Sequence, residues 1–181
     1  MNYSEEFIQR ALLDAPSGSP FSLKRSYNLL TIFNLSWGFF RYGEADIITV
    51  DNKYKLIEGE IKCSYRDFLN DDKKNPEIME ERKKKLECKY YILPLDVYKQ
   101  YENEIFQKVC ERKCGLVVIN GIYCNTIFPA PPFENDYTIN LNQFFKLAKL
   151  ACYRRRGYIN ENELNFKFIE EENETSKNTI K

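Results

Sequence analysis

Acids and a lysine recur at every second position in two neighbouring segments, 43–50 and 54–63. They are Glu44 and Asp46 in the first segment and Glu58, Glu60 and Lys62 in the second. Side chains two residues apart on a β-strand point to the same face, so each set would share one face. Crowded carboxylates repel one another unless a hard cation such as magnesium lies among them or water surrounds them all. The spacing therefore indicates either a cation site made of oxygen ligands or a fully solvated polar surface.

The two segments are predicted to form a β-hairpin. Both are rich in β-branched and apolar residues, and residues 51–53, Asp-Asn-Lys, have the composition of a tight turn. If those three residues form the loop, Asp46 lies opposite Glu58. The same register places Glu44 opposite Glu60, so four carboxylates would meet in one patch.

The motifs within this hairpin resemble those of the PD-(D/E)XK nuclease superfamily. Its signature, an aspartate followed at a distance by Glu/Asp-x-Lys, is matched by Asp46 and by Glu60-Ile61-Lys62. The longer stretch 60–68, Glu-Ile-Lys-Cys-Ser-Tyr-Arg-Asp-Phe, is similar to the EIK-x-S-x-x-D-F segment of small phage and bacterial members, including the MmcB-like DNA-repair branch. The resemblance covers residues 37–121. It departs from the family pattern in two ways: Ala45 replaces the nominal proline, and no histidine follows the lysine-rich segment.

The resemblance implies a restriction-endonuclease-like α/β core, in which helices flank a central mixed β-sheet. It also implies that Asp46 and Glu60 ligate a magnesium or manganese ion, to which the carbonyl of Ile61 adds a ligand. Lys62 would orient the attacking water or hold the phosphate. One or two such cations can neutralise a phosphodiester, activate a water and stabilise the leaving oxygen. Oxygen ligands alone favour magnesium or manganese over zinc.

Three further residues lie beside the signature. Glu58 is either an additional metal ligand or a surface acid satisfied by solvent. Glu44 is a weaker candidate for the same patch. Ser64 is expected to cap the helix that follows the motif, and it is also a candidate to bond a neighbouring carboxylate.

The expected function is that of a Mg²⁺-dependent endodeoxyribonuclease in DNA repair, recombination or phage DNA processing, with DNA as its partner. Two alternatives remain open. One is a catalytically inactive nucleic-acid-binding module on the same fold. The other is a protein-interaction factor from a phage or mobile element, which would use an aromatic-rich surface. The sequence leaves substrate form, sequence preference and oligomeric state open, a homodimer included.

Basic residues at four places are candidates for contacts with nucleic-acid phosphates. They are Arg66; Lys73 and Lys74; Lys83, Lys84 and Lys85; and Lys149 with Arg154, Arg155 and Arg156. Neutralising a phosphate in this way releases counterions and favours binding. For 83–85 the alternative is an exposed helix face, on which Glu80 pairs with Lys84 and Glu81 with Lys85. For the last group the alternative is the solvated face of a helix over 140–156.

Composition favours a single domain. The chain has 181 residues, of which 43% are hydrophobic, and its 27 basic residues equal its 27 acidic ones. That length suits one core, and the charge balance provides no global field that would draw the protein onto DNA. We assign residues 1–169 to one nuclease-like domain and the polar, aperiodic residues 170–181 to a disordered tail. No apolar run reaches the roughly 20 residues of a membrane span, and the first residues lack a secretory pattern, so we expect a cytoplasmic protein without a membrane partner.

Histidine and cysteine usage narrows the chemistry further. The chain has no histidine, which removes Ser-His and Cys-His hydrolases from consideration. Its six cysteines are irregularly spaced and are interpreted as reduced thiols. Cys110 and Cys114 have the spacing of half a zinc site, but no second pair accompanies them.

The rest of the pattern predicts the elements around the hairpin. Helices are expected at 3–14, 22–34, 64–71, 77–86, 95–113 and 140–156, and strands at 37–42, 88–94, 115–119 and 122–128. Helices that alternate with strands in this way are typical of an α/β fold.

Overall fold

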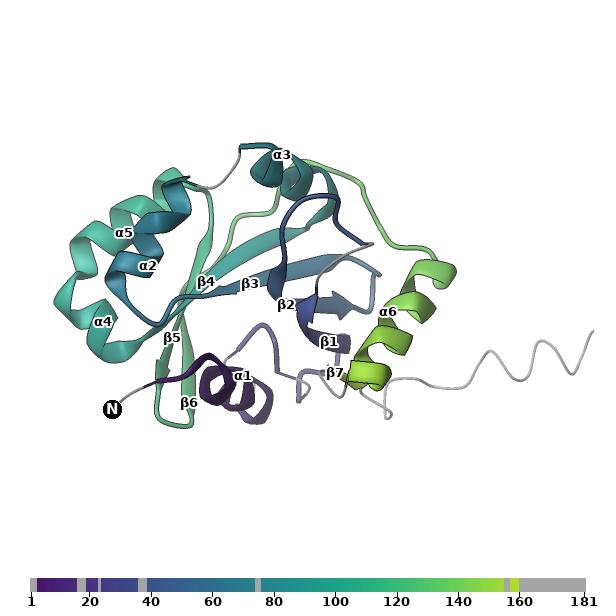
Figure 1. Cartoon of the computed structure of the whole chain (residues 1–181), viewed down its shortest axis with the longest axis horizontal. Helices are drawn as coiled ribbons and strands as arrows, with labels where there is room; N and C mark the ends of the chain where they lie inside the picture. The colour runs from purple at the N-terminus through teal and green to yellow at the C-terminus, as the bar shows by residue number, and fades with distance from the viewer. Residues whose placement is uncertain are drawn as a thin grey trace, which may run out of the picture.

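The sheet at the centre of the molecule is mixed and has helices on both faces (Figure 1). The computed structural model describes residues 3–15, 19–22, 24–35, 39–73, 76–154 and 157–159. Within them the strand order is β6-β5-β4-β3-β2-β1-β7. Strands β3, β4 and β5 run parallel, whereas β1, β2, β6 and β7 pair antiparallel with their neighbours. The predicted α/β class with a central mixed sheet is confirmed.

The elements follow the chain in this order. The strands are β1 (Asn28–Leu35), β2 (Ala45–Asp51), β3 (Leu56–Ile61), β4 (Cys88–Pro94), β5 (Gly115–Asn120), β6 (Tyr123–Phe128) and β7 (Gly157–Ile159). The helices are α1 (Glu5–Asp14), α2 (Tyr65–Asn70), α3 (Pro76–Lys85), α4 (Leu95–Gln100), α5 (Glu102–Glu111) and α6 (Leu141–Arg154), with a short 3₁₀ turn at Asp71–Lys73.

The predicted hairpin forms, but its register differs from the prediction by two residues. Val50 pairs with Leu56 and Ile48 with Glu58. The loop is longer than three residues because the carboxylate of Asp51 accepts hydrogen bonds from the backbone N–H groups of residues 53 and 55. If the same register is continued, Asp46 lies opposite Glu60 rather than Glu58.

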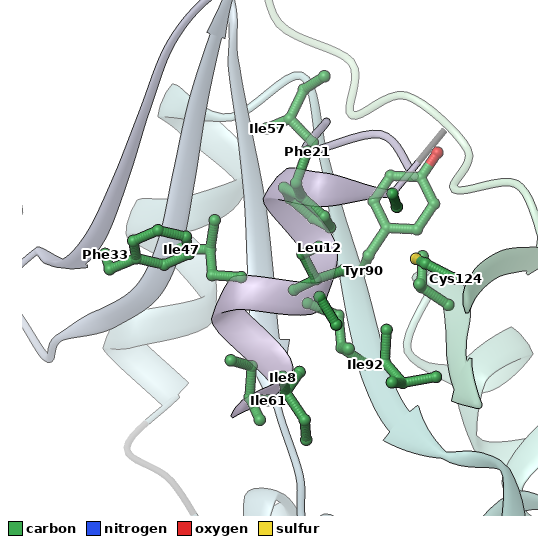
Figure 2. Packing of buried hydrophobic residues seen from close by; sticks show 14 of the residues in the cluster. Ile8, Leu12, Phe21, Phe33, Ile47, Ile57, Ile61, Tyr90, Ile92 and Cys124 are labelled. Carbon is green, nitrogen blue, oxygen red and sulfur yellow. The ribbon is translucent and has the colours of Figure 1, made fainter. Parts of the chain in front are cut away.

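The two faces of the sheet are covered differently. One face buries an apolar cluster beneath α1, which includes Ile8, Leu12, Phe21, Ile47 and Ile92 (Figure 2). Gly59 lies in β3 on this face, where an added Cβ would come within 2.7 Å of both Phe21 and Ile92. A larger residue at Gly59 would therefore displace the side chains of Phe21 and Ile92.

The opposite face holds two apolar clusters. One lies under α2 and α5 and includes Phe68, Leu93 and Ile105. The other lies under α6 and includes Ile48 and Phe144. Between these clusters, Glu58 and Glu60 of β3 lie on the same face, so a polar strip crosses an otherwise apolar face.

Three predicted elements are wrong. Residues 28–34, expected to belong to the helix over 22–34, lie in β1 instead. A strand covered on both faces has a largely apolar run that resembles a helical pattern over a short window. Residues 39–42, expected within a strand, form none. The helix expected over 95–113 is divided into α4 and α5 at Tyr101, whose φ of −132° is not helical.

The other predicted strands and helices are confirmed to within a few residues. No helix in the described part of the chain is long and apolar enough to span a membrane. The predicted disordered tail lies outside the described residues, as do residues 160–169 of the predicted domain.

Candidate functional site

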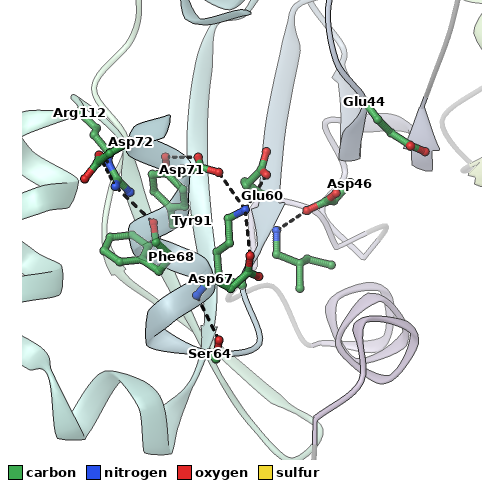
Figure 3. A network of polar contacts seen from close by, with 12 residues as sticks. Glu44, Asp46, Glu60, Ser64, Asp67, Phe68, Asp71, Asp72, Tyr91 and Arg112 are labelled. Carbon is green, nitrogen blue, oxygen red and sulfur yellow. Dashed lines mark hydrogen bonds and ion pairs between the residues drawn. The ribbon is translucent and has the colours of Figure 1, made fainter. Parts of the chain in front are cut away.

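The structure brings together the three residues of the predicted signature. Asp46 lies on β2 and Glu60 on β3 (Figure 3). Lys62 follows directly after β3. The backbone N–H of Ile61 donates to Asp46 Oδ2 at 2.7 Å, and Lys62 Nζ donates to Glu60 Oε1 at 2.9 Å. The side chain of Asp46 therefore continues the contact between β2 and β3 beyond the last paired backbone residues.

Asp46 has a pKa far above that of an ordinary aspartate. Burial, together with the negative charge of Glu60, raises its pKa from 3.8 to about 7, despite the opposing hydrogen bond from Ile61. Asp46 lies opposite Glu60 when the hairpin register is continued by one residue, so the two carboxylates are close enough to repel each other. Two neighbouring carboxylates of this kind are a suitable start for a cation site.

Lys62 lies between two acids. Its Nζ is 2.9 Å from Asp71 Oδ1 as well as 2.9 Å from Glu60, and the exposed Asp67 is 4.0 Å away. Tyr91 fixes Asp71 by donating its hydroxyl hydrogen to Oδ2 at 2.6 Å. Burial alone would lower the pKa of Lys62, but Glu60 and Asp71 raise it above its ordinary value. Lys62 is therefore a permanent cation, suited to donating a hydrogen bond rather than to accepting a proton.

Glu58 faces two cations instead of solvent. Arg82 Nε of α3 lies 2.6 Å from its Oε2, and Lys89 Nζ of β4 lies 2.9 Å from its Oε1. Lys89 also reaches Glu60 Oε2 at 3.1 Å, so it bridges the two glutamates. Burial works against the charge of Lys89, but Glu58 and Glu60 raise its pKa well above the ordinary value.

These contacts form one buried ladder of alternating charge, in the order Arg82, Glu58, Lys89, Glu60, Lys62 and Asp71. Three acids and three bases cancel within it. The side chains are at most 7% exposed. Asp46 is the one acid beside the ladder that has no ion pair within the described part of the chain. The crowded carboxylates expected from the sequence are thus neutralised mainly by neighbouring cations.

Of the supporting residues, one differs from the prediction and one agrees with it. Glu44 is exposed and projects away from Glu60 (Figure 3), so the predicted pairing of these two residues is wrong. Ser64 accepts a hydrogen bond from the backbone N–H of Asp67 at 3.1 Å, which confirms it as the N-cap of α2. Ile61, whose carbonyl is a predicted metal ligand, contacts Asp46 through its backbone N–H.

The lysines of α3 differ in their partners and in their exposure. Lys85 pairs with Glu81 at 2.8 Å, as predicted, and also donates to the carbonyl of Phe39. Glu81 accepts from the backbone N–H groups of residues 41 and 42, so it holds the segment that leads into β2. Lys83 pairs with Glu80, the residue expected to pair with Lys84. Lys83 and Lys84 are the exposed lysines of this helix that remain available to a ligand.

The other candidate phosphate contacts are only partly described. Arg66 on α2 and Lys149 on α6 are both exposed. The remaining candidates fall outside the described residues or side chains; they are Lys73, Lys74, Arg154, Arg155 and Arg156.

Sequence reasoning did not identify Lys89, Arg82 and Asp71 as members of the site. Lys89 left a signal, since it is the only charged residue in the strongly apolar strand 88–94. A lysine in such a strand needs a buried acidic partner. Arg82 and Asp71 left no comparable signal, because each lies in a run of charged residues.

Asp46 and Glu60 could supply two ligands of a cation, but they do not form a complete metal site by themselves. Within the described residues, no three acidic or cysteine side chains are grouped as a ready-made metal site. Magnesium is commonly held by one or two carboxylates, and water and substrate phosphates complete its shell. The raised pKa of Asp46 is consistent with a position where an added positive charge would relieve repulsion. The residues present therefore fit a weakly bound magnesium or manganese ion.

A cavity of about 640 Å³ opens beside the ladder, between α3, the end of α5 and residues 132–134. Lys89, Tyr91 and Asp71 are among its lining residues, together with Arg112. Asp46, Glu60 and Lys62 do not line it. The cavity therefore borders the residues that hold the signature in place, not the signature itself.

Comparisons with known proteins bear on the fold alone. No protein-family model matches the chain, and no curated protein matches it. A similar solved structure is the SPO1766 protein of unknown function from Silicibacter pomeroyi, with a TM-score of 0.56 and 13% sequence identity. The match covers 85% of this chain and 90% of that one. At 13% identity, this match shows similarity of fold alone.

Proposed function

We propose that this protein is a metal-dependent nuclease, with a restriction-endonuclease-like core, that hydrolyses DNA phosphodiester bonds. The observation that carries the proposal is the meeting of Asp46, Glu60 and Lys62 at the end of two adjacent strands. Two acids that repel each other and a lysine that stays protonated supply the groups that such hydrolysis needs.

Each residue has a distinct task in this proposal. Asp46, the half-buried acid, and Glu60 would hold magnesium or manganese, which supplies charge neutralisation and water activation when bound. Lys62 is held by Asp71 and donates to the phosphate or to the water. Because its charge is fixed, Lys62 stabilises negative charge as it develops and does not act as a base.

The decisive experiment is incubation of the purified protein with single-stranded, duplex, flap and junction DNA in magnesium or manganese. We expect cleavage of at least one substrate, no cleavage in chelator, and none by Asp46→Asn. The amide that this substitution introduces would keep an oxygen that accepts from Ile61 N–H, so loss of cleavage would be attributable to the charge. If no substrate is cut with either metal, the nuclease proposal is wrong.

A second candidate is a catalytically inactive nucleic-acid-binding module, and the charge ladder favours it. Both oxygens of Glu60 already contact ammonium groups, one from Lys62 and one from Lys89. A carboxylate neutralised in this way attracts a cation less strongly. Retarded migration of DNA on a gel, without cleavage in any metal, would support the module over the enzyme.

A further inference from the structure

We propose that Lys89 is a positioning residue that sets the orientation of Glu60 for a divalent cation. This inference rests on the proposed metal-dependent function. Lys89 lies on β4, outside the recognised signature, and its Nζ is 3.1 Å from Glu60 Oε2. Lys62 contacts the other oxygen, Oε1, at 2.9 Å. With one ammonium on each oxygen, the carboxylate cannot rotate without breaking an ion pair.

Lys89 is itself held from the far side. Glu58 Oε1 lies 2.9 Å from Lys89 Nζ, and Glu58 Oε2 lies 2.6 Å from Arg82 Nε. Arg82 stacks its guanidinium over Phe40, with 3.5 Å between the central carbon and the ring centroid. The order of contacts therefore runs from α3 through Glu58 and Lys89 to Glu60. We call Arg82, Glu58 and Lys89 the positioning relay.

The relay is better explained by its effect on the orientation of Glu60 than by a contribution to folding stability. Buried ion pairs contribute little net stability compared with well-packed apolar residues, because desolvation offsets the attraction. Side chains that hold a metal ligand commonly affect metal affinity or activity about 10- to 100-fold without touching the metal. The relay ends on the acid expected to bind the cation, which is where such an effect would be useful.

This geometry also assigns a role to Glu58, for which the sequence left two alternatives open. Both of its oxygens contact cations, and its side chain is 1% exposed. Glu58 is therefore the counter-ion of Lys89 and Arg82, and a bound cation would not contact it.

The test uses a charge-balanced double variant, Glu58→Gln/Lys89→Met. It removes one negative and one positive charge, so the total charge of the ladder stays the same. Because Glu60 loses the competing ammonium of Lys89, weaker cation binding would come from lost orientation and not from lost attraction. We expect Mn²⁺ binding, measured by calorimetry without DNA, to weaken about 10- to 100-fold. We also expect the cleavage rate at saturating metal and DNA to fall. A purely structural role would lower the melting temperature but leave Mn²⁺ affinity unchanged, and that result would overturn the inference.

The matched control is Lys55→Met/Glu87→Gln. Lys55 and Glu87 form an ion pair that is a quarter exposed and lies apart from the ladder. The substitutions are of the same kind, so this variant should bind Mn²⁺ as the wild type does. An equal loss of affinity in the control would show that the effect is not specific to the relay and would also overturn the inference.

Phe40→Leu keeps the inference testable if the double variant does not fold. This change removes the ring beneath Arg82 and alters no charge. We expect weaker Mn²⁺ binding in the same direction but by less than about 10-fold; unchanged affinity in a folded Phe40→Leu protein would count against the relay. If the wild-type protein itself neither binds Mn²⁺ nor cuts DNA, the proposed function fails and the inference fails with it. If the wild type binds and cuts but the relay variants match it, the inference alone fails.

Discussion

Two lysine–glutamate pairs at almost the same distance show how differently the molecule uses charge. Lys89 lies 3.1 Å from Glu60 in the sheet, and Lys83 lies 3.0 Å from Glu80 on α3. The first pair is 2% and 5% exposed, the second 50% and 61%. Water and salt screen the exposed pair, whereas the buried charges depend on each other for solvation. The distance between the charges therefore says little about what their removal would cost.

The largest expected effect is the loss of stability in Glu60→Ala. That change leaves Lys62 and Lys89 each with one acidic partner fewer in a buried site. Breaking a buried pair by removing one partner costs about 3–5 kcal/mol. We expect urea denaturation to show a decrease of that order in the free energy of unfolding.

Glu80→Ala is the matched control on the exposed pair, and its unfolding curve should coincide with that of the wild type. If Glu60→Ala unfolds at the same urea concentration as Glu80→Ala, the contrast between buried and exposed pairs is wrong. Glu60→Gln, which keeps the shape and one acceptor oxygen, is expected to lose less stability than Glu60→Ala.

The part of the site that the sequence predicts is the part encoded within one strand. Alternation along β3 places Glu58, Glu60 and Lys62 on one face, and the structure agrees. Lys89 meets Glu60 through the parallel register between β3 and β4, in which Glu58 aligns with Lys89. No local pattern specifies that register, so the neutralising partners could not be predicted.

The fold shows the same division between local and non-local information. Helix α2 was predicted from the capping serine Ser64, a signal that directly precedes the helix. Strand β1 was mistaken for a helix because its burial on both faces is a property of the finished sheet. The hairpin register was wrong because the side chain of Asp51 lengthens the turn, which composition does not reveal.

Asp46→Asn is expected to remove cleavage and to change stability increasingly as pH rises above about 4. The pKa of Asp46 is about 7 in the folded protein and near the ordinary 3.8 in the unfolded chain. As pH rises through this interval, the unfolded chain loses the proton first, so ionisation of Asp46 increasingly opposes folding. Below about pH 4 both states keep the proton and the acid has no effect.

Thermal melts without divalent metal would measure this effect. The melting temperature of Asp46→Asn should match the wild type near about pH 4 and exceed it near about pH 8. Magnesium should raise the melting temperature of the wild type near about pH 8 more than that of the variant. If the melting temperatures of Asp46→Asn and the wild type differ by the same amount at both pH values, the pKa of Asp46 is not raised in the folded protein.

Lys62→Met/Asp71→Asn tests whether the protonated Lys62 contributes to catalysis in addition to forming ion pairs. The double change removes one charge of each sign, so it limits the number of uncompensated buried groups. We expect the rate at saturating DNA to fall about 10²- to 10³-fold, the range for loss of one donor to a developing negative charge. DNA affinity and its dependence on salt should change little. Lower affinity with an intact rate would identify Lys62 as an ordinary phosphate contact.

The smallest expected effect on stability comes from Lys83→Ala/Lys84→Ala, which tests the exposed side of the comparison. Both lysines project into solvent from α3, so the melting temperature should be unchanged. If both contact phosphates, the slope of log affinity against log salt should become shallower by about two, while the rate at saturating DNA stays the same. Lys99→Ala, an exposed change on α4, is the control and should leave the slope unaltered. An unchanged slope in the double variant would leave Lys83 and Lys84 with the structural role of solvated helix charges, and the DNA-binding surface would have to lie elsewhere on the molecule.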